Sequence, residues 1–170
     1  STGFRRIRKP FWAVDAAMPL LFLPETTALV VFVILQCLAL AKDRIREGML
    51  NRLMILSAFA VLGAAALALN ASGQIFHATY KIDALSQGFK FTVALALLFT
   101  ILASENAVSI DRGRRAEYFS FLSTAALGMM MITSAVDLLS FYVALELSSY
   151  SLYLLASLRR DPRSPEAGVK

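Results

Sequence analysis

Cysteine and histidine are almost absent from this 170-residue chain, which holds one residue of each. The lone cysteine, Cys37, excludes an internal disulfide, and its apolar surroundings predict a packing role. The lone histidine, His77, lies in a polar segment and has no companion ligands for a metal. The six methionines, three of them at 129–131, are interpreted as adaptable packing rather than as a copper site. The sequence therefore predicts neither a disulfide framework nor a metal centre.

The motifs of soluble catalysis are also missing. There is no glycine-rich phosphate loop, no nucleophile with a neighbouring base and no paired-cysteine motif. The formal net charge is +5, but no pattern of interleaved aromatic and basic residues suggests nucleic-acid binding. Cations in the loops of a membrane protein, where they face anionic lipid, explain the basic balance.

Hydrophobic residues, in contrast, make up 58% of the chain, and the mean hydropathy is +0.63. Both values exceed what soluble domains show. With short flanks and tilt, five apolar stretches approach the roughly 20 residues that cross a bilayer. They are Glu25 to Ala41, Leu53 to Asn70, Phe89 to Ser104, Tyr118 to Thr133 and Leu138 to Leu158. We predict an all-α, polytopic membrane protein with about five transmembrane helices, in which residues 1–170 form one membrane domain.

The connections between these stretches carry local signals. Asp137 is the last residue of a short break at 134–137 and is predicted to cap the last helix. Residues 71–83 mix turn residues with alternating apolar positions, which favours a small extended excursion at the membrane surface. Glu25 follows Pro24 and is predicted in a helix first turn, where its charge suits the helix dipole. Lys90 begins the third apolar stretch and is predicted to reach the interface as an anchor.

The distribution of the 17 Lys and Arg residues predicts the orientation in the membrane. Most of them lie in residues 42–52, 112–115 and 159–170, on one side of the predicted helices. Because positive loops stay in the cytoplasm, the N-terminus is expected outside. The basic cluster at residues 5–9 conflicts with this assignment, and a signal peptide ending near 39–41 is an alternative interpretation of the first stretch.

Glu146 is the most unusual residue of the chain because a carboxyl lies in the middle of an apolar stretch. A helix from Leu138 would carry it about 12 Å inward, close to the centre of a bilayer roughly 30 Å thick. A charge there costs about 2.5 kcal/mol or more. On the same helix side lie hydroxyls of Tyr142, Ser149, Tyr150 and Tyr153. This pattern indicates a proton relay, with polar helix-to-helix packing as the alternative.

The residues around Glu146 also resemble a known family. The run from Ser134 to Arg160, with 164–170, is similar to subunit N of bacterial respiratory complex I, an antiporter-like subunit of proton-pumping NADH:quinone oxidoreductase. The segments 23–25 and 80–85 support the resemblance, which covers most of residues 20–170. It implies that the sequence is the N-terminal fragment of a longer bundle of helices.

The resemblance implies a function and a set of partners. Glu146 would be a charge-switching glutamate that pairs with a lysine beyond residue 170, and Lys170 would be a second proton-channel residue or an interfacial anchor. The chain would belong to a translocating enzyme but carry no cofactor. Quinone would bind elsewhere in the complex. Other membrane-arm subunits and the lipid bilayer would be its partners in the bacterial inner membrane, with the N-terminus in the periplasm.

Two classes of alternative remain at this point. Related antiporter-like subunits occur in multisubunit Na⁺/H⁺ antiporters and in membrane-bound hydrogenases or dehydrogenases. A scaffold that transports nothing and only anchors other subunits is the second class. The carboxyl in mid-span argues against a scaffold on general grounds.

Overall fold

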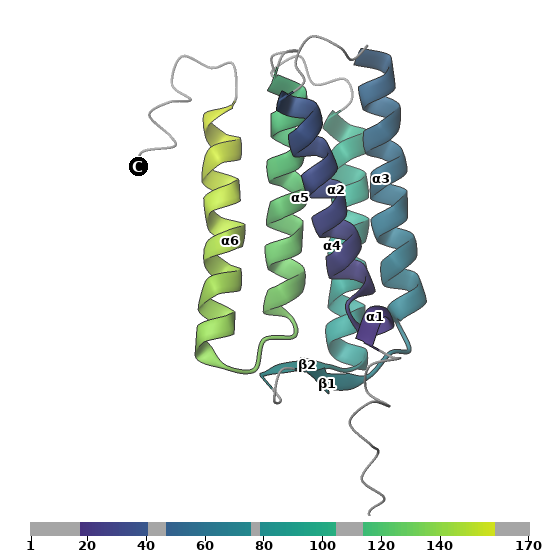
Figure 1. The fold of residues 1–170 in the computed structure, drawn as a ribbon, viewed down its shortest axis with the longest axis vertical. Coiled ribbons are helices and arrows are strands. Elements are labelled where there is room, and N and C mark those ends of the chain that lie inside the picture. Colours follow the sequence, from purple (N-terminus) through teal and green to yellow (C-terminus); the bar gives the residue numbers. More distant parts are fainter. Residues whose placement is uncertain (1–17, 41–46, 76–78, 105–113, 159–170) are drawn as a thin grey trace, which may run out of the picture.

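The computed structural model describes residues 18–40, 47–75, 79–104 and 114–158. Within these ranges the chain is almost entirely helical and contains one small hairpin of strands (Figure 1). The elements are α1 (Met18–Leu21), α2 (Leu23–Leu40), α3 (Glu47–Ala68), β1 (Gly73–Ile75), β2 (Tyr80–Ile82), α4 (Ala84–Ser104), α5 (Arg115–Ile132) and α6 (Leu138–Ser157). The predicted all-α fold with about five long helices is confirmed.

The five long helices are not equally apolar. Among the described residues, α3, α4 and α6 are long and apolar enough to cross a membrane by length and composition, and α2 contributes a shorter apolar helix, Leu23–Leu38. α5 is more polar because serine and threonine recur along it, and several of these residues are buried. A helix surrounded by other helices does not need a lipid-facing apolar surface, so the polarity of α5 fits its position.

That position is the centre of the bundle. α5 packs against α2, α4 and α6, while α3 packs on α2 and α4 (Figure 1). The core joins large side chains such as Leu35, Met54 and Met130 with small ones such as Ala58 and Ala94. α6 lies at the edge of the described bundle, with α5 as its main neighbour.

Cys37 departs from the predicted packing role. The thiol is free and its side chain is exposed on α2. The nearby Val33 and Ile34 are also exposed, so this side of α2 faces away from the described helices. An apolar neighbourhood in sequence did not distinguish a lipid-facing position from a core position, because both are apolar in a membrane protein.

The predicted extended excursion between the second and third stretches is confirmed as a hairpin. β1 and β2 pair antiparallel, with Gly73 opposite Ile82 and Ile75 opposite Tyr80. The hairpin runs across the ends of the helices where α4 and α6 begin (Figure 1). His77 falls between the two strands and lies outside the described residues.

Asp137 caps α6 as predicted. Its backbone is extended, and its Oδ2 atom accepts a hydrogen bond from the Ser140 N–H at 3.1 Å. Hydrogen bonds from the Ser140 hydroxyl and then from its N–H hold the pKa of Asp137 below its ordinary value. The cap satisfies a backbone donor that the helix itself leaves free.

The Asp137 cap should respond to acid. Because the folded pKa is lowered, its stabilisation is complete above the ordinary aspartate pKa and is lost as the pH falls through the lowered value. Asp137→Ala should speed hydrogen exchange at the Ser140 amide at neutral pH, whereas Asp137→Asn should keep the cap at all pH values. The Ser86 amide, capped by Asp83 at 2.9 Å, is the internal control. Equal exchange at Ser140 in both variants would contradict the assignment.

Candidate functional site

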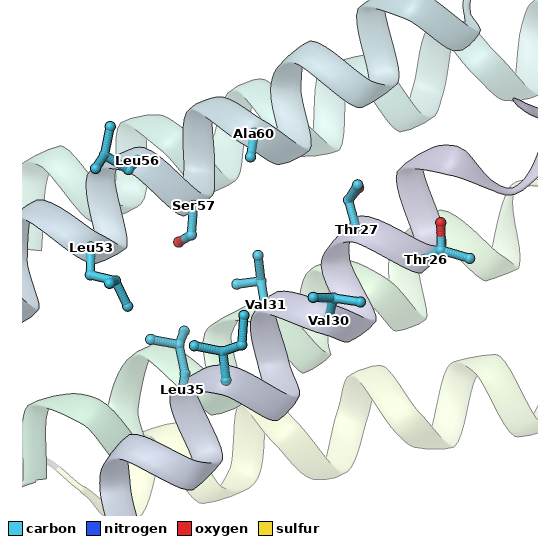
Figure 2. Close-up of a pocket in the computed structure, with 10 residues that line it drawn as sticks. Thr26, Thr27, Val30, Val31, Leu35, Leu53, Leu56, Ser57 and Ala60 are labelled. Carbon is cyan, nitrogen blue, oxygen red and sulfur yellow. The ribbon is translucent and has the colours of Figure 1, made fainter.

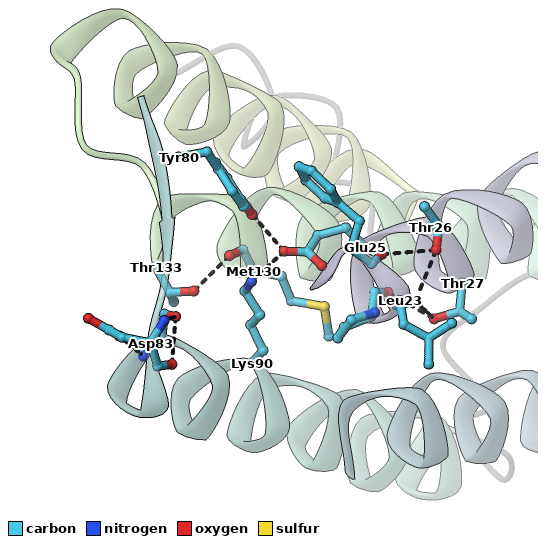
Figure 3. Close-up of polar contacts among 12 residues, drawn as sticks. Leu23, Glu25, Thr26, Thr27, Tyr80, Asp83, Lys90, Met130 and Thr133 are labelled. Carbon is cyan, nitrogen blue, oxygen red and sulfur yellow. Dashed lines mark hydrogen bonds and ion pairs between the residues drawn. The ribbon is translucent and has the colours of Figure 1, made fainter. Parts of the chain in front are cut away.

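A buried ion pair joins the first turn of α2 to the second turn of α4. Lys90 Nζ lies 2.6 Å from Glu25 Oε1, and the two side chains are 0% and 6% exposed. Figure 3 shows both side chains between the helices, near the strand that carries Tyr80. Charges so fully removed from water are tolerated only when they are paired, so each residue requires the other.

The hairpin supplies a third member of this cluster. The hydroxyl of Tyr80 on β2 donates a hydrogen bond of 2.6 Å to the same Glu25 oxygen (Figure 3). The Tyr80 ring stacks on Phe22 at 5.0 Å, and Lys90 Nζ lies 5.3 Å from its centroid. Burial and then the Glu25 charge raise the pKa of Tyr80 far above its usual range. The phenol therefore remains a hydrogen-bond donor at physiological pH.

The predicted role of Lys90 as an interfacial anchor was wrong. The helix begins at Ala84, five residues before the apolar stretch, so Lys90 lies in the second helical turn and points into the bundle. Glu25 is in the first turn of its helix as predicted, but its carboxylate also neutralises Lys90. One signal could have suggested the pair: α2 and α4 start at the same end of the bundle and place opposite charges at similar depths.

Glu146 lies on the side of α6 that faces away from α5. The residues of α6 that are buried against its neighbour are Ala144, Ser148, Ser151 and Leu155. With about 100° between successive residues, Glu146 projects roughly opposite to this row. Its side chain is half-buried, and the side chain of Tyr142, one turn earlier, interacts with its carboxyl.

The predicted hydroxyl stripe occupies this same uncovered side of α6. Tyr142, Tyr150 and Tyr153 are each more than half exposed, and Ser149 is half-buried. The stripe and Glu146 thus share one side, and none of the described helices covers it. Lys170, the other predicted channel residue, lies outside the described residues. The structure therefore does not bring Glu146 together with the buried Glu25 and Lys90 cluster.

A groove of about 440 Å³ between α2 and α3 has a different character (Figure 2). Its lining is aliphatic apart from Thr26, Thr27 and Ser57. Each of these hydroxyls donates to a backbone carbonyl of its own helix, Thr27 to Leu23 at 2.8 Å for example. The hydroxyl groups of the lining therefore already have hydrogen-bond acceptors within their own helices, and the groove is unsuited to holding a charge.

Comparisons with known proteins identify relatives that are similar in sequence. No family model matches the chain. NADH-quinone oxidoreductase subunit N 2 of Solidesulfovibrio magneticus is 44% identical over 109 residues, 63% of this chain and 23% of the relative. Subunit N 2 of Opitutus terrae is 33% identical over 82% of this chain and 29% of the relative. Subunit N of Geobacillus kaustophilus is 39% identical over 78% of this chain and 27% of the relative.

A solved structure of respiratory complex I contains a chain with a similar fold. A chain of respiratory complex I from Thermus thermophilus, determined with bound aureothin, superposes with a TM-score of 0.69 at 27% identity, over 86% of this chain and 31% of the other. The chain spans about a quarter of the length of the curated relatives it matches. The shared sequence and fold place it in one family: the chain belongs to the family of NADH-quinone oxidoreductase subunit N.

Proposed function

We propose that this chain is part of a proton-translocating membrane-arm subunit of respiratory complex I, in which Glu146 switches its charge during turnover. The observation that carries the proposal is the position of Glu146. The carboxyl lies mid-way along α6, among hydroxyls, on a side that no described helix covers. Exposure of this polar side to lipid would cost free energy, so protein or water is expected to lie against it.

The chemistry that this side can perform is proton transfer. A carboxylate holds a proton when no cation is near and releases it when one approaches. Tyr142 interacts with the carboxyl in the present structure, and Ser149 and Tyr150 extend the row of hydroxyls along α6. A lysine from a segment beyond residue 170 would supply the cation, and Lys170 would continue the path. A change relayed from quinone reduction would alter this pairing and move a proton.

The partners and the orientation follow from the same proposal. Quinone and the electron carriers would bind to other subunits, and this chain would contact membrane-arm subunits and lipid in the bacterial inner membrane. The hairpin end of the bundle, where α2, α4 and α6 start, would face the periplasm together with the N-terminus. The excess of Lys and Arg in residues 42–52, 112–115 and 159–170, which follow α2, α4 and α6 in the sequence, supports this orientation.

The alternatives of a Na⁺/H⁺ antiporter or hydrogenase subunit are less favoured, because the relatives compared above carry the name of subunit N. A passive scaffold is disfavoured by the cost of Glu146 in mid-span. Isolation of the intact complex would separate these possibilities, since quinone reduction by NADH is expected only of complex I.

Glu146 can be tested in the assembled complex. Glu146→Gln keeps the size and hydrogen bonding of the side chain but cannot ionise, so proton pumping per electron should fall strongly while assembly is retained. Glu146→Asp should keep part of the pumping. The measurement is proton uptake into vesicles together with NADH oxidation.

Asp83→Asn is the matched control. Asp83 is an exposed carboxylate beside Lys81 at 3.3 Å, outside the helices, and asparagine preserves its hydrogen bond to the Ser86 amide. Pumping in this variant should equal that of the parent complex. If Glu146→Gln pumped as well as Asp83→Asn, the proposed role of Glu146 would be abandoned.

A further inference from the structure

The connection between α5 and α6 is fastened to the hairpin by backbone hydrogen bonds. The Lys81 N–H donates to the Ser134 carbonyl, and the Val136 N–H donates to the Thr79 carbonyl, both at 2.9 Å. Tyr80 and Ala135 form the antiparallel bridge between these bonds. The segment just before Asp137 is therefore paired with β2 through one isolated antiparallel bridge, and the start of α6 depends on where β2 lies.

The position of β2 depends in turn on Tyr80. Among the described residues, Leu21, Phe22 and Ile82 form a small apolar cluster with Tyr80, separate from the main core. The Tyr80 hydroxyl adds a directional bond of 2.6 Å to the buried carboxylate of Glu25. A hydrogen bond to a charged group is stronger than one between neutral groups, so this bond is a strong and directional attachment of the hairpin to α2.

The carboxylate is itself held by Lys90. The ion pair at 2.6 Å fixes the Glu25 side chain from α4, while Glu25 belongs to α2. Glu25 Oε1 thus contacts Lys90 from α4 and Tyr80 from β2. Two helices and the hairpin are joined at a single atom, and the backbone bonds of β2 carry that connection on to α6.

We propose that Glu25 and Lys90, acting through Tyr80, are positioning residues that fix the start of α6 and so the location of Glu146. The inference rests on the proposed function for the role of Glu146. From Asp137 to Glu146 the helix rises about 14 Å, so a tilt at its start displaces the carboxyl relative to any partner. The cluster is a mechanical support of the proton site and does not itself carry the proton.

Tyr80→Phe in the intact complex isolates this connection. The variant keeps the ring, its stacking on Phe22 and the backbone of β2, and removes only the hydroxyl. Hydrogen exchange at the Lys81 and Val136 amides should become faster, on the order of tenfold, which is the effect of losing one charge-assisted hydrogen bond. Protons pumped per electron should fall, while the rate of NADH oxidation is retained.

Lys81→Met is the matched control, because Lys81 is on the same strand but its side chain is 54% exposed. Exchange at Val136 and the pumping ratio should not change in this variant. Unaltered exchange at both amides in Tyr80→Phe would overturn the proposal. Faster exchange with an unaltered pumping ratio would also overturn it, provided that Glu146→Gln lowers the ratio.

The two proposals fail in different ways. If Glu146→Gln leaves the ratio unaltered, the proposed function fails, and the attachment of α6 is then judged by exchange alone. If Glu146→Gln lowers the ratio and Tyr80→Phe does not, the proposed function stands and the positioning role is rejected.

Discussion

Replacing Lys90 with methionine is expected to destabilise the bundle by about 3–5 kcal/mol, because the change leaves the Glu25 carboxylate buried without a counter-charge. The methionine matches the length of the lysine stem, so the loss is of charge and not of volume. Both side chains are almost fully inaccessible, which leaves solvent no way to screen the unpaired carboxylate. The measurement is the thermal stability and yield of the assembled complex.

A double variant distinguishes charge pairing from a general intolerance to change. Glu25→Gln with Lys90→Met removes both charges and keeps an acceptor for the Tyr80 hydroxyl. Replacing a whole buried pair by neutral groups is often nearly neutral, so the double variant should be more stable than Lys90→Met alone. Destabilisation equal to the sum of the two single variants would show that the residues are not energetically coupled.

Adding one methyl group at Gly128 should separate α5 from α6. A Cβ atom at this position would lie 2.7 Å from the Ser148 nitrogen and 2.9 Å from the Ala144 carbonyl oxygen. Both are backbone atoms of α6, which cannot move aside as a flexible side chain can. Overpacking of this kind costs about 1–3 kcal/mol, and small residues are what allow membrane helices to approach closely.

The effect of Gly128→Ala should extend to Glu146, because Ala144 and Ser148 flank it on α6. We expect lower thermal stability of the complex and a lower pumping ratio. Gly63→Ala is the control, since Gly63 is also within a long helix but a Cβ there would meet nothing within 4 Å. That variant should be neutral or stabilised by up to about 1 kcal/mol, the difference in helix propensity. Equal stability of the two alanine variants would contradict the close contact.

The substitutions at Lys90 and Gly128 should both displace α6, but they affect different parts of the helix. Gly128 sets the approach of α6 to α5 in mid-helix, and Lys90 supports the hairpin that fixes the beginning of α6. The side of α6 that carries Glu146 is left free by both contacts. This arrangement leaves the polar side of α6 uncovered by the described helices, as the proposed function of Glu146 requires.

The sequence by itself determined the properties that depend on local pattern. The length of each apolar stretch predicted the long helices, alternation predicted an extended segment between the second and third of them, and a capping residue predicted the start of α6 at Asp137. The helical period also placed Glu146 among the tyrosines. These properties require only neighbours within a few turns, so a single sequence is sufficient to predict them.

The tertiary structure alone decided which distant residues meet. Lys90 could not be distinguished from an interfacial anchor until α4 began at Ala84 and Glu25 lay opposite it. Tyr80 reaches the same carboxylate across 55 positions of sequence, and a Cβ at Gly128 would meet backbone atoms of α6. In a membrane protein the core and the lipid-facing surface are equally apolar. Hydrophobicity therefore does not determine these pairings, which depend on how the helices pack.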